Sequence, residues 1–193
     1  MRNKVIKTRK TSETDVTLEF SIDGKGRSEI NTPVSFLNHM LELFTFHGCF
    51  DMKLNVRGDT DVDFHHTVED IGIVLGVAIN ESLGDKKGIS RYASISVPMD
   101  EALSELSLDI SGRPYLNFKA LPEPAKIGQF DTELVEEFFQ AVVNNAMLTL
   151  HIVSSFGTNN HHIAESIFKG FGIILRSATR ITLNDRADST KWI

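Results

Sequence analysis

Apolar and polar residues alternate along residues 14–22 and again along residues 103–110. A period of two is typical of a strand that is buried on one face only. Each run ends at a glycine-containing turn, DGKG or SGRP, and continues into a second short strand, so we predict a β-hairpin at both places. The segments FDMKLNV and LTLHIVS are predicted to add a further strand to each hairpin.

Helical spacing of apolar residues follows each hairpin. It covers residues 34–46 and 131–146, and longer helices are predicted at 65–83 and 161–179. The order hairpin, helix, strand, helix therefore occurs twice. Each sheet needs a cover on one face, and the two helices of the same unit can provide it.

The repetition extends to the residues themselves. HHTVEDIGIVLGVA and HHIAESIFKGFGII align without a gap, and the neighbouring segments align more loosely. Chance similarity of amphipathic elements is the alternative, but several elements recur in the same order, which favours an internal duplication. The matched positions are His65 with His161, His66 with His162, Glu69 with Glu165, Gly76 with Gly172, His39 with Glu137, and Glu13 with Glu101.

We therefore predict an α+β fold made of two similar halves that form one compact domain, with the helices of each half on one face of its sheet. The first half is expected at residues 1–90 and the second at residues 91–183, followed by a polar C-terminal tail at 184–193.

Composition narrows the choice of partners. The formal net charge of −6 argues against a general nucleic-acid binder, which usually carries a basic surplus. No apolar run approaches the roughly 18 residues that a membrane helix needs. The N-terminal residues have no apolar core of signal-peptide length, so we expect a cytoplasmic protein. Cys49 is the only cysteine, which excludes an internal disulfide.

The repeated HHxxE cluster predicts a metal site. Residues three and four apart share a helix face, so Glu69 can stand beside either histidine of its pair, while adjacent histidines diverge by about 100°. One motif can then give a His/Glu pair to one metal and its other histidine to a second. Two motifs favour two reciprocal sites, with His39 and Glu137 of the preceding helices as further ligands.

A single pair of adjacent histidines is usually surface or capping chemistry. Two pairs with glutamate at the same offset favour metal binding. The donors are nitrogen and oxygen only, which suits Mn²⁺, Fe²⁺, Co²⁺, Ni²⁺ or Zn²⁺. The arrangement is not the HExxH motif of metalloproteases.

Cations near these motifs predict an anion site. Arg113 lies between Gly112 and Pro114 in the turn SGRPY, and Arg91 and Lys169 lie close to motif segments. Ser189 and Lys191 in the tail could close over a phosphate. His47, at the end of a predicted helix, could cap that helix or contact a substrate.

The sequence resembles the imidazoleglycerol-phosphate dehydratase family of histidine biosynthesis over essentially its whole length. VDFHHTVEDIGIVL and GTNNHHIAESIFK are similar to the two signatures of that family, and FLNHML, SGRPY, FDTELVEEFF and TLHI also match. The resemblance implies that D-erythro-imidazole-glycerol phosphate is dehydrated to imidazole-acetol phosphate. It also implies two Mn²⁺ ions per active site, held between subunits of a 24-subunit homo-oligomer.

The resemblance also implies roles for individual residues. The metal ligands would be His39, His65, His66, Glu69, Glu137, His161, His162 and Glu165. Contacts to the small phosphorylated imidazole substrate would come from Glu13, His47, Arg91, Arg113, Lys169, Ser189, Thr190 and Lys191.

The chemistry expected of such a site is removal of a carbon-bound proton that no adjacent carbonyl makes acidic. The substrate's imidazole ring can accept the electrons if it is bound as an imidazolate between the two metals. Glu165 and Glu13 are the candidate general base and general acid, in either order. The cations would hold the phosphate and so position the ring.

Two other classes of function use the same residues. A metal-storing shell needs the histidines but no anion site, so phosphate-ester binding that depends on Arg113 separates it from an enzyme. A metal-dependent hydrolase of a small phosphorylated compound would release inorganic phosphate, whereas a dehydratase releases only water.

Overall fold

A computed structural model describes residues 2–121 and 125–182 of the chain. The first half is a four-stranded sheet in the order β1-β2-β4-β3 with two helices. Its elements are β1 (Val5–Lys10), β2 (Thr14–Ser21), β3 (Arg27–Asn31), α1 (Ser35–Gly48), β4 (Asp51–Gly58) and α2 (His65–Leu83).

The second half repeats this plan, with the sheet order β5-β6-β10-β7. A two-stranded β8-β9 pair is added ahead of its first helix. The elements are β5 (Tyr92–Met99), β6 (Ala102–Asp109), β7 (Tyr115–Lys119), β8 (Lys126–Ile127), β9 (Phe130–Asp131), α3 (Glu133–Ala146), β10 (Thr149–Phe156) and α4 (Asn160–Ala178).

Strand order, strand direction and helix length all agree between the halves. Along each sheet two antiparallel pairings are followed by one parallel pairing at the edge, β4 with β3 and β10 with β7. The helices have 14 and 19 residues in both halves, and the shorter helix ends in both at a left-handed residue, Cys49 or Met147. The predicted α+β fold of two similar halves is confirmed.

Both predicted hairpins were assigned the wrong partner strand. β2 does not pair with β3, because β4 lies between them, and the hairpin partner of β2 is β1. The same holds for β6, which pairs with β5 and with β10. The turn DGKG instead leads from β2 to β3 on the far side of β4. β3 and β4 are then parallel neighbours connected through α1, a link that a two-residue turn cannot make.

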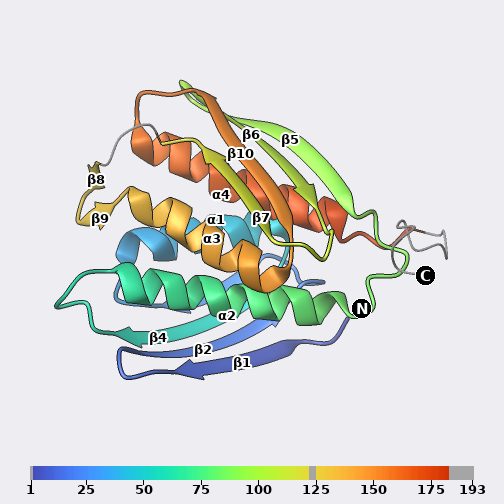
Figure 1. Ribbon diagram of the computed structural model, residues 1–193, viewed down its shortest axis with the longest axis horizontal. Helices are drawn as coiled ribbons and strands as arrows, with labels where there is room; N and C mark the ends of the chain where they lie inside the picture. The colour runs from blue at the N-terminus through green and yellow to red at the C-terminus, as the bar shows by residue number, and fades with distance from the viewer. Residues whose placement is uncertain (1, 122–124, 183–193) are drawn as a thin grey trace.

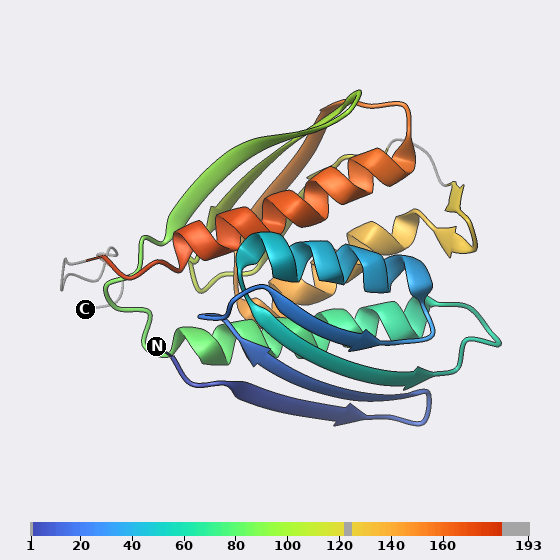
Figure 2. The same cartoon turned by 180° about the vertical axis from the view of Figure 1, so that it is seen from behind.

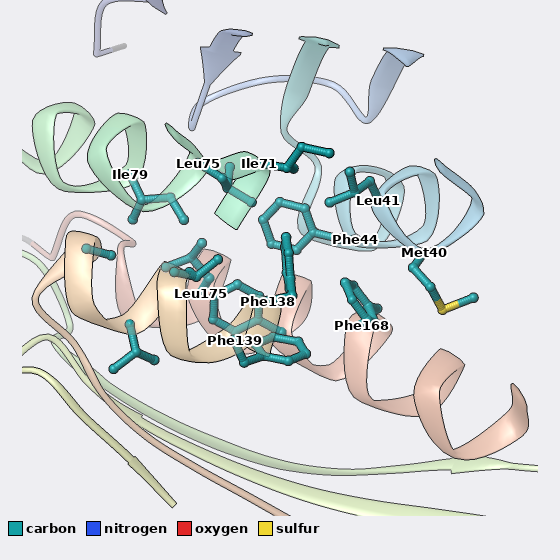
Figure 3. Packing of buried hydrophobic residues seen from close by; sticks show 14 of the residues in the cluster. Met40, Leu41, Phe44, Ile71, Leu75, Ile79, Phe138, Phe139, Phe168 and Leu175 are labelled. Atoms are coloured by element: carbon teal, nitrogen blue, oxygen red, sulfur yellow. The ribbon is translucent and has the colours of Figure 1, made fainter. Parts of the chain in front are cut away.

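Helices fill the space between the two sheets (Figures 1 and 2). α1 and α2 lie on the first sheet, α3 and α4 lie on the second, and the halves meet through α1 against α4 and α2 against α3. The core at this contact is aromatic. Phe44 of α1 stacks on Phe171 of α4, and Phe138, Phe139 and Phe168 pack beside them (Figure 3). Helices on one face of each sheet were predicted and are confirmed.

Glycines allow these helices to approach closely. A Cβ added to Gly76 of α2 would lie 2.6 Å from the carbonyl oxygen of Val142 in α3. A Cβ added to Gly172 of α4 would lie 2.5 Å from the carbonyl oxygen of Phe44 in α1. These are the two glycines that the duplication aligns, so the close contact is itself repeated.

The division at residues 90 and 91 stays a prediction, and the predicted tail at 184–193 lies outside the described residues. Among the helices of the described part, none is long and apolar enough to cross a membrane.

Candidate metal centre

Three potential metal ligands meet where α1 crosses α4. They are His39 of α1 and His161 and Glu165 of α4, and their ligand atoms all lie within 4.8 Å of one another. Glu165 Oε2 is 3.3 Å from His161 Nε2 and 3.9 Å from His39 Nε2. His161 and Glu165 share a face because they are one helical turn apart. The halves therefore combine here, with one ligand from the first and two from the second.

Glu165 is nearly buried and is held in its charged form. Its Oε1 atom accepts a 2.6 Å contact from the Lys169 ammonium, one turn further along α4. Burial opposes ionisation, but Lys169, together with His39 and His161, outweighs it and lowers the pKa of Glu165. One carboxylate oxygen thus faces the lysine, and the other faces the two imidazoles as an anion.

The start of each motif helix fixes its first histidine. Asn159 caps α4 by accepting a hydrogen bond from the backbone N–H of His161 at 2.9 Å. Asp63 accepts the N–H of His65 at 2.8 Å in the same way. The rings of adjacent histidines stand nearly perpendicular, at 83° for His161–His162 and 89° for His65–His66.

The second histidine of each motif is held by a carboxylate at Nδ1. Glu101 Oε2 lies 2.7 Å from His162 Nδ1, and Asp59 Oδ2 lies 3.0 Å from His66 Nδ1. Glu13 Oε2 is also near His66 Nδ1, at 3.8 Å. The hydrogen bond to Glu101 raises the pKa of His162, and the hydrogen bond to Asp59 raises that of His66. His162 in turn contributes most to lowering the pKa of Glu101 to about 2.

The residues of the first motif are not members of this ligand group. His65 is exposed, and Glu69 and Glu137 are partly exposed on α2 and α3. Among the described residues, the group at the α1–α4 crossing is the one set of three close donors, and it contains none of His65, His66, Glu69 and Glu137. Their metal roles stay predictions.

His47 lies two turns along α1 from His39 and is next to further cations. Burial and then the charge of Lys169 lower its pKa, while Glu165 has the opposite effect. His47 also lines an open hollow of about 920 Å³ whose wall includes Arg2, Arg176 and Arg180. These arginines were not among the residues predicted from the sequence.

The two predicted anion-binding arginines differ in setting. Arg91 is buried, its backbone is left-handed at φ 69°, and its guanidinium lies 2.7 Å from Asp109. Arg113 is exposed in the turn after the left-handed Gly112, where its backbone is held by Ser111. Arg91 therefore already has a carboxylate partner in β6, and both substrate roles stay predictions. Ser189, Thr190 and Lys191 lie outside the described residues.

Comparison with known proteins decides the family. The family model of imidazoleglycerol-phosphate dehydratase matches residues 32–175. The chain is 55% identical over 186 residues to the imidazoleglycerol-phosphate dehydratase of Methylorubrum populi, with 95% of each protein covered. The chain belongs to the imidazoleglycerol-phosphate dehydratase family. The enzyme of Acetivibrio thermocellus is 56% identical over 180 residues, covering 93% of this chain and 92% of the relative.

Solved structures of the dehydratase family share the fold. The Staphylococcus aureus imidazoleglycerol-phosphate dehydratase matches with a TM-score of 0.85 at 47% identity, covering 93% of this chain and all of that one. The Pyrococcus furiosus enzyme, solved in complex with (S)-C348, matches with a TM-score of 0.84 at 37% identity, covering 97% and 99%.

The donor set fits the metal dependence of the dehydratase family. Imidazole nitrogens and a carboxylate, with no thiolate, suit a divalent metal such as Mn²⁺. The charged state of Glu165 also fits, since a ligand must be deprotonated to bind. His39, His161 and Glu165 can therefore hold such an ion.

Two residues that hydrogen-bond to the motif histidines, Asp59 and Glu101, were not predicted as functional. The alignment of Glu101 with Glu13 in the duplication was a usable signal for the second. Nothing in the sequence distinguished Asp59 from the other acids of the segment GDTDVD.

Proposed function

We propose that this chain dehydrates D-erythro-imidazole-glycerol phosphate to imidazole-acetol phosphate and water, in L-histidine biosynthesis. The observation that carries the proposal is the His39–His161–Glu165 group in a chain 55% identical to a dehydratase of that name. The reaction class is a hydro-lyase, which breaks a carbon–oxygen bond without transfer of the phosphate.

Two Mn²⁺ ions would bind at this centre. His39, His161 and Glu165 would hold one part of the coordination, and His65, His66, Glu69, Glu137 and His162 would supply the remaining ligands. When bound, the ions would supply Lewis acidity at the nitrogens of the substrate's imidazole ring. The separation of the two motifs within one chain supports a site that is shared between neighbouring copies.

Glu165 and Glu13 would transfer the two protons of the elimination. One carboxylate would take the proton from carbon, and the other carboxyl group would give a proton to the leaving hydroxyl. The lowered pKa of Glu165 keeps it ionised at neutral pH, as a general base requires. Glu13 is exposed near His66, and it is free of the short hydrogen bond that Asp59 makes to that ring. Glu13 therefore has an oxygen available to a substrate, whereas Glu165 would gain one only when its contact with Lys169 is broken.

Cations would hold the phosphate and so position the imidazole ring. Lys169 is the best placed, since its ammonium contacts Glu165 and its charge reaches His47. A phosphate that pairs with Lys169 would compete with Glu165 for the ammonium and release one carboxylate oxygen. Arg91, Arg113, His47 and the tail residues Ser189 to Lys191 would complete the substrate site.

The assembly would be a homo-oligomer of 24 subunits in the cytoplasm, with neither nucleic acid nor membrane as a partner. The observation that supports oligomerisation is the incomplete state of the first motif in a single chain. Sedimentation of the purified protein with and without Mn²⁺ measures the assembly directly.

Product analysis tests the proposed reaction. The purified chain with Mn²⁺ should convert imidazole-glycerol phosphate to a product lighter by one water, with no release of inorganic phosphate. Release of phosphate would instead identify a hydrolase, and no turnover despite metal binding would favour a storage protein.

A variant tests the role of Glu165. Glu165→Gln with metals retained should lose most turnover, because the amide cannot accept the proton. Glu105→Gln on β6 is the control, since Glu105 is exposed and its carboxylate accepts a hydrogen bond from Ser155. Wild-type kcat in Glu165→Gln would remove Glu165 from the proton transfer.

A further inference from the structure

The same contact occurs in both halves: a carboxylate, Asp59 or Glu101, accepts a hydrogen bond from the second histidine of the motif. Neither carboxylate is among the proposed metal ligands or substrate contacts. In both halves a carboxylate oxygen lies within hydrogen-bonding distance of Nδ1, in His66 and in His162. A neutral imidazole carries its proton on one nitrogen, and a carboxylate can only accept. In its neutral form each ring therefore carries its proton on Nδ1, and Nε2 keeps its lone pair.

The nitrogen without a proton, Nε2, is also the atom through which the neighbouring histidines face Glu165. His39 and His161 both approach Glu165 through Nε2. In His162, Nε2 is 3.9 Å from Asp100 Oδ2, beyond hydrogen-bonding distance, so that contact does not hold a proton there. A carboxylate that orients a metal-binding histidine from its far side is a common arrangement in metal sites.

We propose that Asp59 and Glu101 are positioning residues that fix the tautomer and ring orientation of His66 and His162 for metal binding through Nε2. The inference rests on the proposed function, since it assumes that His66 and His162 are metal ligands. It adds two residues that act through those histidines without touching the metal or the substrate.

The two halves obtain this carboxylate from different places. Glu101 immediately precedes β6, just as Glu13 immediately precedes β2, and the duplication aligns the two. The first half nevertheless uses Asp59, at 3.0 Å from the ring, and leaves Glu13 at 3.8 Å. Asp59 comes from the connection between β4 and α2, residues 59–64, which is longer than the matching connection at 157–159.

This difference explains how equivalent glutamates can serve different purposes. Glu101 is fully engaged, since it accepts the backbone N–H groups of Thr158 and Asn159 as well as the His162 ring. Glu13 does not hydrogen-bond to the His66 ring, because Asp59 does so instead. Glu13 is therefore available to a substrate, and Glu101 is not.

Asp59 offers the cleaner test, because among the described residues the side chain of Asp59 hydrogen-bonds to His66 alone. Asp59→Ala should bind Mn²⁺ about 10- to 100-fold more weakly, the usual effect of losing such a partner. Asp61→Ala is the matched control, an exposed aspartate in the same connection. Titration calorimetry on the full chain measures both affinities, and thermal unfolding checks that both variants fold.

A double-mutant cycle separates positioning from a general structural role. In a His66→Asn background, Asp59→Ala should cause no further loss of Mn²⁺ affinity, because its effect passes through the ring. The ¹⁵N spectrum of the metal-free Asp59→Ala chain should also show His66 moving toward the tautomer protonated on Nε2.

Two outcomes overturn the inference. One is Mn²⁺ affinity in Asp59→Ala equal to that of Asp61→Ala, and the other is an equal loss with and without His66. A His66→Asn variant that binds Mn²⁺ as tightly as the unchanged chain would instead contradict the ligand role of His66, which belongs to the proposed function.

Discussion

Gly172 of α4 gives the sharpest test of how the fold sets the metal centre. The Cβ of an alanine at this position would lie 2.5 Å from the carbonyl oxygen of Phe44 and 3.0 Å from the backbone nitrogen of Gly48, both in α1. Neither atom can rotate away, because both belong to the helix backbone. Gly172→Ala must therefore move α1 and α4 apart.

The size of the movement follows from the contact. Restoring an ordinary separation of 3.4 Å to the Phe44 oxygen needs a shift of roughly 0.9 Å. Overpacking of this kind costs about 1–3 kcal/mol, and the better helix propensity of alanine returns about 1 kcal/mol. We expect Gly172→Ala to lower the free energy of unfolding by about 0–2 kcal/mol.

The metal centre should suffer more than the stability does. His39 lies on α1, and His161 and Glu165 lie on α4, so a shift between the helices changes the distances between ligands. Metal–ligand distances are usually kept within about 0.2 Å of their preferred values. We therefore expect Mn²⁺ affinity to fall by at least about tenfold, equivalent to roughly 1.4 kcal/mol.

Gly170→Ala is the matched control on the same helix. Its added Cβ would lie 2.6 Å from Leu106 Cδ1, which is the end of a flexible side chain on β6 of the second sheet. This variant should keep the Mn²⁺ affinity of the unchanged chain. Urea unfolding and titration calorimetry on both variants decide the matter. Unchanged Mn²⁺ affinity in Gly172→Ala, or an equal loss in both variants, would refute the coupling of helix spacing to the metal centre.

Three further predictions concern the side chains at the site. His39→Asn should reduce Mn²⁺ stoichiometry or affinity in calorimetry with little change in urea unfolding, because the His39 side chain is 46% exposed; tight binding at full stoichiometry would exclude His39 as a ligand. Lys169→Met should raise the pKa of His47 in an NMR titration of the metal-free chain, because the ammonium adds to burial in lowering it; an unchanged pKa would contradict that coupling. Since the pKa of His47 in the folded state lies below its ordinary 6.5, its contribution to stability is complete above pH 6.5 and is lost as the pH falls through the lowered value. His47→Asn should therefore lose less stability than the unchanged chain on acidification from pH 6.5, a difference that urea unfolding at each pH measures.

Local periodicity predicted the helices well and the sheets less well. The predicted helix at 65–83 has the observed bounds of α2, because its apolar pattern and its polar start are both local signals. The position of β4 between β2 and β3 is a non-local choice that no turn residue encodes. β1 was not predicted, since VIKTRK is a basic edge strand with one buried residue, Val5.

Residues of the site within one local motif were also predicted, whereas contacts between distant segments were not. Repetition of HHxxE identified the histidines and Glu165, because the motif lies within single helices. The meeting of His39 with His161 could not be read from spacing, since it depends on α1 packing on the helix of the other half. The partner of His66 is likewise set by the course of a connection, the segment from Asp59 to Phe64.

The aromatic contact between α1 and α4 and the close approach of α2 to α3 make the seam between the halves the interior of the molecule. A chain cut between Gly84 and Ile89 should therefore remain associated, because the peptide link there carries little of the cohesion. A primordial half-length chain would have exposed this same surface and paired with its twin, giving two identical centres. Fusion of the two copies into one gene would have freed each centre to change alone, which is consistent with the separate sources of the Asp59 and Glu101 carboxylates.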